Sequence, residues 1–426
     1  MKRLSGVKGF HDVLPPQSER FSAIERRLCA VLAAYNYVEI RTPIAERTEL
    51  FARSLGETTD IVEKEMYTFE DRDGTSLTLR PECTASVVRA AIEGGLAARD
   101  QVAKLYYLGP MFRRERPQRG RSRQFHQVGV ELLGRDDALA DAEVVSLLVD
   151  CLEAAGVTEG ELVLNSLGDA ECRPAYRQAL EAFGRARVDA LCEACRRRVE
   201  RNPLRLLDCK EESCRRVMAD APSVADHLCD PCRRHFAEVE RLLAAAGVPY
   251  VRNPRLVRGL DYYVRTAFEV TAPGLGAQNA VGGGGRYDGL VADLGGPPLA
   301  GVGFAIGLER LVMAAGEGAD AARPELYVIP LAAGAAEAAF RLARTLRRAG
   351  VRLELEAAGR SAKSAMRRAD KLGARYAVLI GEDELGAGRA TVRDLGRQAD
   401  HRLAIALDAE GAAAADAIRR LGGGDA

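Results

Sequence analysis

The sequence has no apolar run that approaches the roughly 20 residues needed to span a bilayer. Residues 1–16 also lack the apolar core of a signal peptide and end in two prolines. We therefore expect a cytoplasmic protein without a membrane partner. The formal net charge of the 426 residues is +0, so any nucleic acid must be bound by local patches and not by a global field.

Two nucleotide-binding signatures are also missing. No G-x-x-x-x-G-K-[ST] pattern is present, and the glycine run 282–285 is not followed directly by the helix of a dinucleotide-binding unit. We interpret this run as a strand whose missing side chains let a flat ligand lie against the backbone. A hydrophobic content of 47% and a charged content of 29% are typical of a globular chain with two or three domains.

The most informative stretch is 105–134. Two apolar, aromatic runs, 105–112 and 125–133, flank an arginine-rich turn, which predicts a long β-hairpin with a cationic tip. The tip suits phosphate binding, although an exposed loop is an equal alternative. Alternation with a period of two puts three residues of the second strand on one polar face, suited to a pocket floor: Gln127, Gly129 and Glu131.

Glu82 stands between a predicted strand, 77–80, and a predicted helix, 85–94, for which Thr84 is a plausible amino-terminal cap. A carboxylate at such a junction commonly faces a ligand, but a surface position would fit equally well. Further elements predicted from periodicity are helices at 17–35 and 138–155 and strands at 37–40, 161–167 and 302–306.

The segment RGLDYY, 258–263, sets two tyrosines beside an arginine and an aspartate, before a strand predicted at 264–270. Buried tyrosines need hydrogen-bond partners, so the segment indicates a site or, alternatively, ordinary packing. Arg310 falls where the helix predicted at 311–315 opens, against the preference of a helix amino terminus for acidic residues. This mismatch favours a role on a phosphate or a base.

The composition changes between 172 and 249, where the sequence is helical, charged and rich in cysteine. Two C-x-x-C pairs in this module can supply the four thiolates of a structural zinc site: Cys192, Cys195, Cys229 and Cys232. Cys209, Cys214, His227 and His235 are then spare ligands. A set of reduced thiols without a metal is the alternative.

From 324 onward the pattern alternates between strands and helices, as expected of a separate α/β unit with a mixed or parallel sheet. Strands are predicted at 326–330, 351–355, 376–380 and 389–395, and helices at 335–349 and 361–372. The helix 361–372 is strongly basic, so it is either a solvated face or a surface for RNA.

With these motifs, with KGFHDVLP near the start and with SAKSAMRRADKLGARYAVLIGEDEL near the end, the chain resembles histidyl-tRNA synthetases over essentially its whole length. The resemblance implies an α+β fold, in which helices flank the antiparallel catalytic sheet of class II synthetases. It also implies a homodimer with the segment around Pro43 at its interface. The implied domains are catalytic (1–170 and 251–320), helical insertion (171–250) and C-terminal anticodon-binding α/β (324–422).

The resemblance implies a ligase that uses ATP with Mg²⁺ to convert L-histidine into histidyl-adenylate and then transfers it to the 3′ end of tRNA(His). One alternative is a synthetase-like regulatory subunit of ATP phosphoribosyltransferase. Such paralogues lack the tail domain and erode the motif arginines, whereas Arg113, Arg258 and Arg310 are present here. A synthetase-like RNA sensor would carry kinase or linker segments that the sequence does not show.

The same resemblance implies residue roles. Arg113 and Arg258 would be catalytic, on opposite sides of the reacting carboxylate and α-phosphate. ATP would be bound by Arg113, Glu115, Arg121 and Arg310. Histidine would be bound by Glu82, Thr84, Arg113, Gln127, Glu131, Arg258, Tyr262, Tyr263 and Tyr287. The tRNA acceptor end would meet Arg116, Gln118 and Arg119.

Within the histidine set, Glu131 and Tyr263 would bind the imidazole nitrogens, and Glu82, Thr84 and Gln127 the ammonium group. Cys83 stands where the family commonly has glycine, which predicts slight crowding of the amino-group pocket. A cysteine-rich insert occurs in only part of the family, so the resemblance does not imply zinc.

Overall fold

The computed structural model describes residues 4–422 except 57–58, 60, 97–100, 277–278, 317–322, 397–401 and 409. Its contacts divide the chain into two units, Met1–Asp320 and Ala321–Ala426. Among the described residues no helix is long and apolar enough to cross a membrane.

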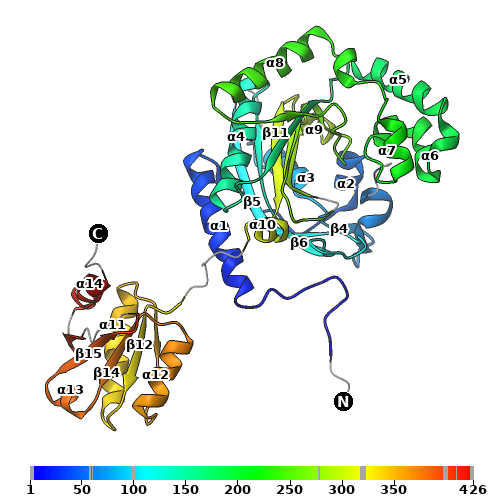
Figure 1. The fold of residues 1–426 in the computed structure, drawn as a ribbon. Helices are drawn as coiled ribbons and strands as arrows, with labels where there is room; N and C mark the ends of the chain where they lie inside the picture. The colour runs from blue at the N-terminus through cyan, green and yellow to red at the C-terminus, as the bar shows by residue number, and fades with distance from the viewer. Residues whose placement is uncertain are drawn as a thin grey trace. The chain divides into compact units, whose positions relative to one another are not determined.

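The first unit is built on an eight-stranded sheet with the order β1-β5-β6-β11-β10-β9-β7-β8 (Figure 1). All neighbours from β5 to β7 pair antiparallel, and only the short edge strands β1 and β8 pair in parallel. In spatial order the strands are Val38–Glu39, Ala103–Phe112, Gln124–Leu133, Gly301–Gly307, Ala280–Arg286, Val264–Thr271, Glu161–Ser166 and Val251–Arg252. The predicted hairpin and the predicted antiparallel sheet are confirmed.

Alternation along these strands gives the sheet two different faces. Val128, Val130 and Leu132 of β6 join one apolar core under four helices. These helices are α1 (Gln17–Ala34), α4 (Ala138–Ala154), α8 (Asp230–Ala245) and α10 (Leu308–Ala314). The other face of β6 carries Glu131, as predicted from the period of two, and the functional residues gather on that side.

The second face is covered by α2 (Thr48–Leu55), α3 (Thr84–Glu93) and α9 (Leu290–Asp293), together with tyrosines of the loops. A small sheet precedes α3, with the order β2 (Ala45–Arg47), β4 (Ser76–Leu79) and β3 (Tyr67–Glu70). Between α2 and β3 the chain forms a π-helical turn, Ile61–Glu65. Strand β4 confirms the strand predicted at 77–80, whereas β2, β3 and α2 were not predicted.

The predicted helical module leaves the sheet after β7 and returns through α8, which packs on α4. Between them lie α5 (Arg173–Arg185), α6 (Glu193–Arg201) and α7 (Glu212–Met218). Three 3₁₀ turns connect them: Val188–Ala190, Pro203–Leu206 and Val224–His227. The module has its own small core, in which buried cysteines alternate with aliphatic residues and Tyr176.

The second unit has a five-stranded sheet with the order β13-β12-β14-β15-β16. The first three strands in this order pair in parallel and the last two antiparallel, which confirms the predicted mixed sheet. The strands are Leu353–Leu355, Leu326–Pro330, Tyr376–Ile380, Arg389–Asp394 and Arg402–Ala406. The helices are α11 (Ala335–Arg348), α12 (Ala362–Lys371), α13 (Glu382–Gly386) and α14 (Gly411–Gly422). Strand β16 and helices α13 and α14 were not predicted.

Candidate active site

A cavity opens beside the middle strands of the large sheet, between the hairpin turn, β10, β11 and the start of α10. Four arginines and three glutamates contribute to its wall, although they come from distant parts of the chain. The charged residues are Arg113, Arg121, Arg258, Arg310, Glu115, Glu269 and Glu309. Of the residues named from the sequence, the cavity brings together Arg113, Glu115, Arg121, Gln127, Arg258 and Arg310.

Each of the two predicted catalytic arginines is oriented by fixed partners. Arg113 Nε donates to the carbonyl oxygen of Pro81 at 2.8 Å, and its guanidinium lies 5.3 Å from the ring centroid of Phe125. Arg258 Nη1 donates to Glu269 Oε2 at 2.7 Å. Such anchoring leaves the guanidinium with little freedom, so its charge is aimed before a ligand arrives.

The other two arginines of the cavity strengthen its cationic character. Arg121 Nη1 pairs with Glu115 Oε2 at 2.6 Å. Burial, and then the like charge of Arg121, lower the pKa of Arg310. An anion bound between Arg121 and Arg310 would relieve this repulsion.

Behind the cavity, Glu131 is 1% exposed and lies at the centre of a polar cluster. Thr84 Oγ1 donates to Glu131 Oε1 at 2.7 Å, and the Tyr287 hydroxyl donates to Glu131 Oε2. Burial raises the pKa of Glu131 to about 8, although the two hydrogen bonds act in the opposite direction and the charge of Glu82 adds to the increase. At neutral pH the carboxyl group is therefore mostly protonated in the free protein.

Two polar groups near this cluster lack hydrogen bonds of normal geometry. Within the described part of the chain, Gln127 Oε1 is buried without a hydrogen bond, and Gln127 lines the cavity. The buried Tyr262 hydroxyl likewise has no hydrogen bond of normal geometry, although the rings of Tyr262 and Tyr263 lie 4.6 Å apart between centroids. Because an unpaired buried polar group costs about 1–3 kcal/mol, both atoms indicate a place for a polar ligand.

The predicted cap of α3 was wrong. Thr84 is the first residue of that helix, and Cys83 occupies the cap position without a side-chain cap bond. The carboxylate of Glu82 instead accepts the backbone N–H groups of Thr84 at 2.6 Å and Ala85 at 3.0 Å. Since Glu82 satisfies these amides, the Thr84 hydroxyl is available to Glu131. The contact recorded for the Cys83 thiol is with Thr42 Oγ1 at 3.4 Å, and crowding of the amino-group pocket stays a prediction.

The glycine run forms β10, as predicted, and makes room for side chains of the protein itself. A Cβ at Gly283 would lie 2.8 Å from Arg258 Nη1, and one at Gly303 of the neighbouring β11 would overlap Glu131 Oε2. Gly282 and Gly283 also line the cavity, so the expected flat ligand against this strand stays a prediction.

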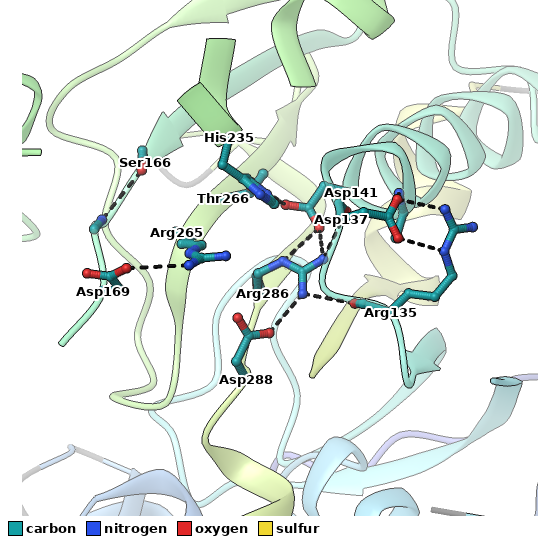
Figure 2. Close-up of polar contacts among 12 residues, drawn as sticks. Arg135, Asp137, Asp141, Ser166, Asp169, His235, Arg265, Thr266, Arg286 and Asp288 are labelled. Atoms are coloured by element: carbon teal, nitrogen blue, oxygen red, sulfur yellow. Dashed lines mark hydrogen bonds and ion pairs between the residues drawn. The ribbon is translucent and has the colours of Figure 1, made fainter. Parts of the chain in front are cut away.

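Sequence reasoning missed a second buried cluster, shown in Figure 2, which lies at the end of β10. Arg286 and Asp141 are both fully buried, and Arg286 Nε donates to Asp141 Oδ1 at 2.9 Å. Asp288 accepts from Arg286 at 2.8 Å, and His235 Nε2 lies 2.7 Å from Asp141 Oδ2. The signal available in the sequence was Asp141, a charged residue among the apolar positions of the helix predicted at 138–155. The cluster fixes the residue directly before Tyr287.

The predicted zinc set, Cys192, Cys195, Cys229 and Cys232, is wrong, because its two pairs belong to different clusters. The first pair lies with Cys209 and Cys214, and the second lies with Asp169 and Cys172. Spacing alone could not show this, since the loop before α7 and α7 itself bring Cys209 and Cys214 to the start of α6. Of the supposed spare ligands, His235 bonds Asp141, and the ring of His227 packs against Tyr176.

The tip residues Arg116, Gln118 and Arg119 are exposed and do not line the cavity. Two of them, Gln118 and Arg119, border a separate groove between the hairpin and the helical module. The basic residues of its wall include Arg119, Lys210, Arg215 and Arg310. Arg310 lines both spaces and links them.

The geometry agrees with comparisons to known proteins. A family model described as histidyl-tRNA synthetase matches residues 9–311, and one described as anticodon binding domain matches 325–408. A histidine–tRNA ligase of Geobacter metallireducens is 53% identical over 399 residues, which cover 93% of this chain and 97% of the relative. A histidine–tRNA ligase of Oleidesulfovibrio alaskensis is 50% identical over 98% of this chain and 100% of its own.

Among solved structures, the apo histidyl-tRNA synthetase of S. aureus matches with a TM-score of 0.78 and 35% identity. The match covers 95% of this chain and 98% of that protein.

Proposed function

Because the chain belongs to the histidyl-tRNA synthetase family and is a histidine–tRNA ligase, we propose how its residues divide the work of that reaction. The enzyme activates histidine with ATP and transfers it to tRNA(His). The family and the intact cavity disfavour the alternative of a regulatory subunit. The observation that carries the residue roles is the cavity of four arginines beside the buried Glu131.

In the first step, the histidine carboxylate attacks the α-phosphate of ATP and pyrophosphate leaves. Arg113 and Arg258 would bind the two approaching anions from opposite sides, which lowers their repulsion and stabilises the charge that develops in the transition state. Arg121 and Arg310 would hold the outer phosphates. The partners of Arg113 and Arg258 support this role, because orientation before binding avoids reorganisation during the reaction.

ATP reacts as its complex with Mg²⁺, a hard cation that prefers oxygen ligands. The carboxylates of Glu115 and Glu269 line the cavity and are of the type that fits this ion, so we propose that they hold it. When bound, Mg²⁺ neutralises part of the phosphate charge. Each glutamate binds its arginine through Oε2, Glu115 to Arg121 and Glu269 to Arg258, and would offer Oε1 to the ion, so that both arginines stay in place.

Histidine would lie with its imidazole toward Glu131 and Tyr263 and its ammonium group toward Glu82, Thr84 and Gln127. An imidazole N–H donated to Glu131 would stabilise its carboxylate form and so offset the cost of burying that charge. An apolar ring of similar size would leave Glu131 and Tyr263 without their partners, which gives the pocket its selectivity. The two atoms without partners, on Gln127 and Tyr262, support this placement.

In the second step, a ribose hydroxyl at the 3′ end of the tRNA attacks the carbonyl carbon of the histidyl-adenylate, the bond from that carbon to the phosphate oxygen breaks, and AMP leaves. No protein base is required if the adenylate and the hydroxyl are held in line. We propose that Arg116, Gln118 and Arg119 meet the acceptor end, supported by the basic groove that begins at the hairpin tip. The exposed basic face of α12, with Lys363, Arg367, Arg368 and Lys371, would contact the anticodon side of the tRNA.

We further propose that 1–170 and 251–320 form the catalytic domain, 171–250 the insertion domain and 324–422 the anticodon-binding domain. The enzyme would act in the cytoplasm as a homodimer. The edge of the large sheet supports a dimer interface around Pro43, since Val38 is 59% exposed and Ile44 45%.

Histidine-dependent exchange between ATP and pyrophosphate tests the division of the site. Glu131→Gln should raise the KM for histidine by one to two orders of magnitude, since a donor faces the imidazole where an acceptor is needed, and leave the KM for ATP nearly unchanged. Glu115→Gln is the matched variant, which should raise the KM for ATP and leave the KM for histidine nearly unchanged. Equal losses for both substrates in Glu131→Gln would mean that this face of β6 is misassigned.

A further inference from the structure

In the described part of the chain, two clusters of four metal-ligating side chains lie in the helical module and at its start, and each includes two residues outside the predicted zinc set. Cluster A consists of Cys192, Cys195, Cys209 and Cys214, and cluster B of Asp169, Cys172, Cys229 and Cys232. In each cluster the four ligand atoms all lie within 4.8 Å of one another. We propose that each cluster binds one divalent, thiolate-preferring metal ion of the Zn²⁺ type.

The sulfur positions suit a single tetrahedral ion. Cys192 Sγ and Cys209 Sγ lie 3.9 Å apart in cluster A, and Cys172 Sγ and Cys232 Sγ lie 3.9 Å apart in cluster B. A Zn–S bond of about 2.3 Å places the sulfurs of a tetrahedral site about 3.8 Å apart. A disulfide would require about 2.05 Å, and all cysteines of the two clusters are free. Mutual distances this short leave room for one ion in each cluster.

The backbone around both clusters stabilises thiolates. Cys192 is the amino-terminal cap of α6 and Cys229 that of α8, so each C-x-x-C pair lies in the positive field of a helix start. The Cys192 backbone N–H donates to Cys214 Sγ at 3.1 Å, and the Asp169 N–H donates to Cys172 Sγ at 3.2 Å. Amides that donate to ligand sulfurs are typical of structural metal–thiolate sites.

The module has a physical need for such crosslinks. α6 has 9 residues and α7 has 7, and cysteines make up much of the core between them. Helices this short bury too little apolar surface to hold one another. Metal ions in clusters A and B would supply the missing stability.

Cluster B also joins the module to the catalytic sheet. Asp169 and Cys172 follow β7, whereas Cys229 and Cys232 begin the return through α8. Asp169 also pairs with Arg265 of β9 at 3.5 Å (Figure 2). One ion at cluster B would therefore link the segment that leaves the sheet after β7 to the start of α8, through which the chain returns.

The module in turn supports the RGLDYY loop. Arg205 donates to the carbonyl oxygen of Gly259 at 2.5 Å, Asn202 Nδ2 donates to Asp261 Oδ1 at 3.2 Å, and Arg173 donates to the carbonyl oxygen of Tyr263. Loss of either ion should loosen this loop. Given the proposed role of Arg258, the KM for histidine should then rise.

Elemental analysis of the full-length protein, purified with a reductant and supplied with zinc, tests the proposal directly. We expect two equivalents of zinc per chain. Cys209→Ser and Cys229→Ser should each retain one equivalent, and the control Cys29→Ser, in α1 outside both clusters, should retain two. Wild-type protein without stoichiometric metal would overturn the proposal. If the wild-type protein holds only one equivalent, the cluster whose cysteine variant keeps that equivalent does not bind metal.

A second measurement covers variants that fail to fold. Cobalt reconstitution of the wild-type protein should give the intense visible bands of tetrahedral Co²⁺ and sulfur-to-metal charge transfer for two ions per chain. Zinc should displace both. Absent or octahedral-type spectra would contradict thiolate sites. Metal content and spectra do not depend on aminoacylation, so failure of this proposal is distinguishable from failure of the residue roles proposed above.

Discussion

Two buried polar clusters meet where β10 ends, and they differ in how completely their groups are paired. In the cluster around Arg286, the guanidinium bonds Asp141, Asp288 and two backbone carbonyls, and His235 and Thr266 complete Asp141. In the cluster around Glu131, by contrast, Gln127 and Tyr262 keep polar atoms without normal hydrogen bonds.

The ionisation of the two carboxyl groups differs in the same way. Burial alone would raise the pKa of Asp141, but His235 and the charge of Arg286 outweigh burial and lower it. For Glu131, burial dominates and raises the pKa to about 8. Since both carboxyls are fully buried, burial does not separate a structural group from a ligand-binding one. The difference lies in whether the protein supplies the partners.

The largest expected effect concerns the paired cluster. Asp141→Ala should lower the free energy of unfolding by about 3–5 kcal/mol, because it leaves the buried Arg286 guanidinium without its main counter-charge. Urea denaturation measures the loss. Glu153→Ala, at an exposed position of the same helix α4, should change stability by less than about 0.5 kcal/mol. A loss below about 1 kcal/mol for Asp141→Ala would show that the cluster does not stabilise the fold.

The next effect concerns catalysis at the cavity. Arg258→Gln should lower kcat for histidine-dependent pyrophosphate exchange by about 10²–10³-fold, because it removes a fixed charge from the transition state. Steady-state kinetics of the exchange reaction measure it. The exposed Arg53→Gln in α2 serves as control and should keep wild-type rates. A kcat within a factor of three of wild type would remove Arg258 from the catalytic set.

The raised pKa of Glu131 gives a pH effect with a defined sign. The folded protein holds a proton that the unfolded chain releases, so this stabilising contribution is complete below the carboxyl's usual pKa and is lost as the pH rises through about 8. Relative to Glu131→Gln, wild-type stability should fall by about 2 kcal/mol between pH 5 and pH 8. A rigid pocket would lose about 1.4 kcal/mol per pKa unit, or about 4 kcal/mol over this range, and relaxation of the pocket reduces the loss. Parallel denaturation curves at each pH measure this, and a constant difference would place the pKa of Glu131 in the ordinary range.

The smallest effect distinguishes two tyrosines of one pocket. Tyr262→Phe removes a hydroxyl without a normal hydrogen bond, so stability should stay within about 0.5 kcal/mol while histidine binding weakens by about 1 kcal/mol. Tyr287→Phe removes a bond to Glu131 and should cost stability as well. Calorimetric binding and thermal unfolding measure the pair. If both variants behave alike, the contrast between paired and unpaired groups is wrong.

The hairpin shows how much of the site local pattern can predict. Its two strands and the face that carries Gln127 and Glu131 follow from alternation alone, because side chains of a strand point to opposite sides. The antiparallel sheet was expected from the resemblance to the family, and the α/β tail was expected from the alternation of predicted strands and helices. In the small sheet before α3 only β4 was predicted; β2 and β3 were missed, since strands as short as the three-residue β2 give no clear pattern.

The cysteines show the limit of such reasoning. Spacing marked the C-x-x-C pairs as ligands, but the fold groups each pair with other residues, and two of these, Asp169 and Cys172, were never candidates. Similarly, Thr84 is of a residue type that often caps helices, yet the Glu82 carboxylate accepts the first backbone amides of α3 and leaves the threonine hydroxyl to Glu131. Short-range preferences lose to such arrangements because several groups compete for the same partners.

The sequence by itself determined which residue types are available: arginines for anions at the hairpin turn, a glycine strand beside them, and thiols in the insert. It also determined the faces on which strand residues lie. Only the tertiary structure decided which of these groups share a partner, which cysteines share a cluster, and which buried carboxyl is paired by the protein and which is left for a ligand. The physical reason is that pairing and burial depend on contacts between segments far apart in the chain, and a carboxyl's pKa follows from those contacts and not from its neighbours in sequence.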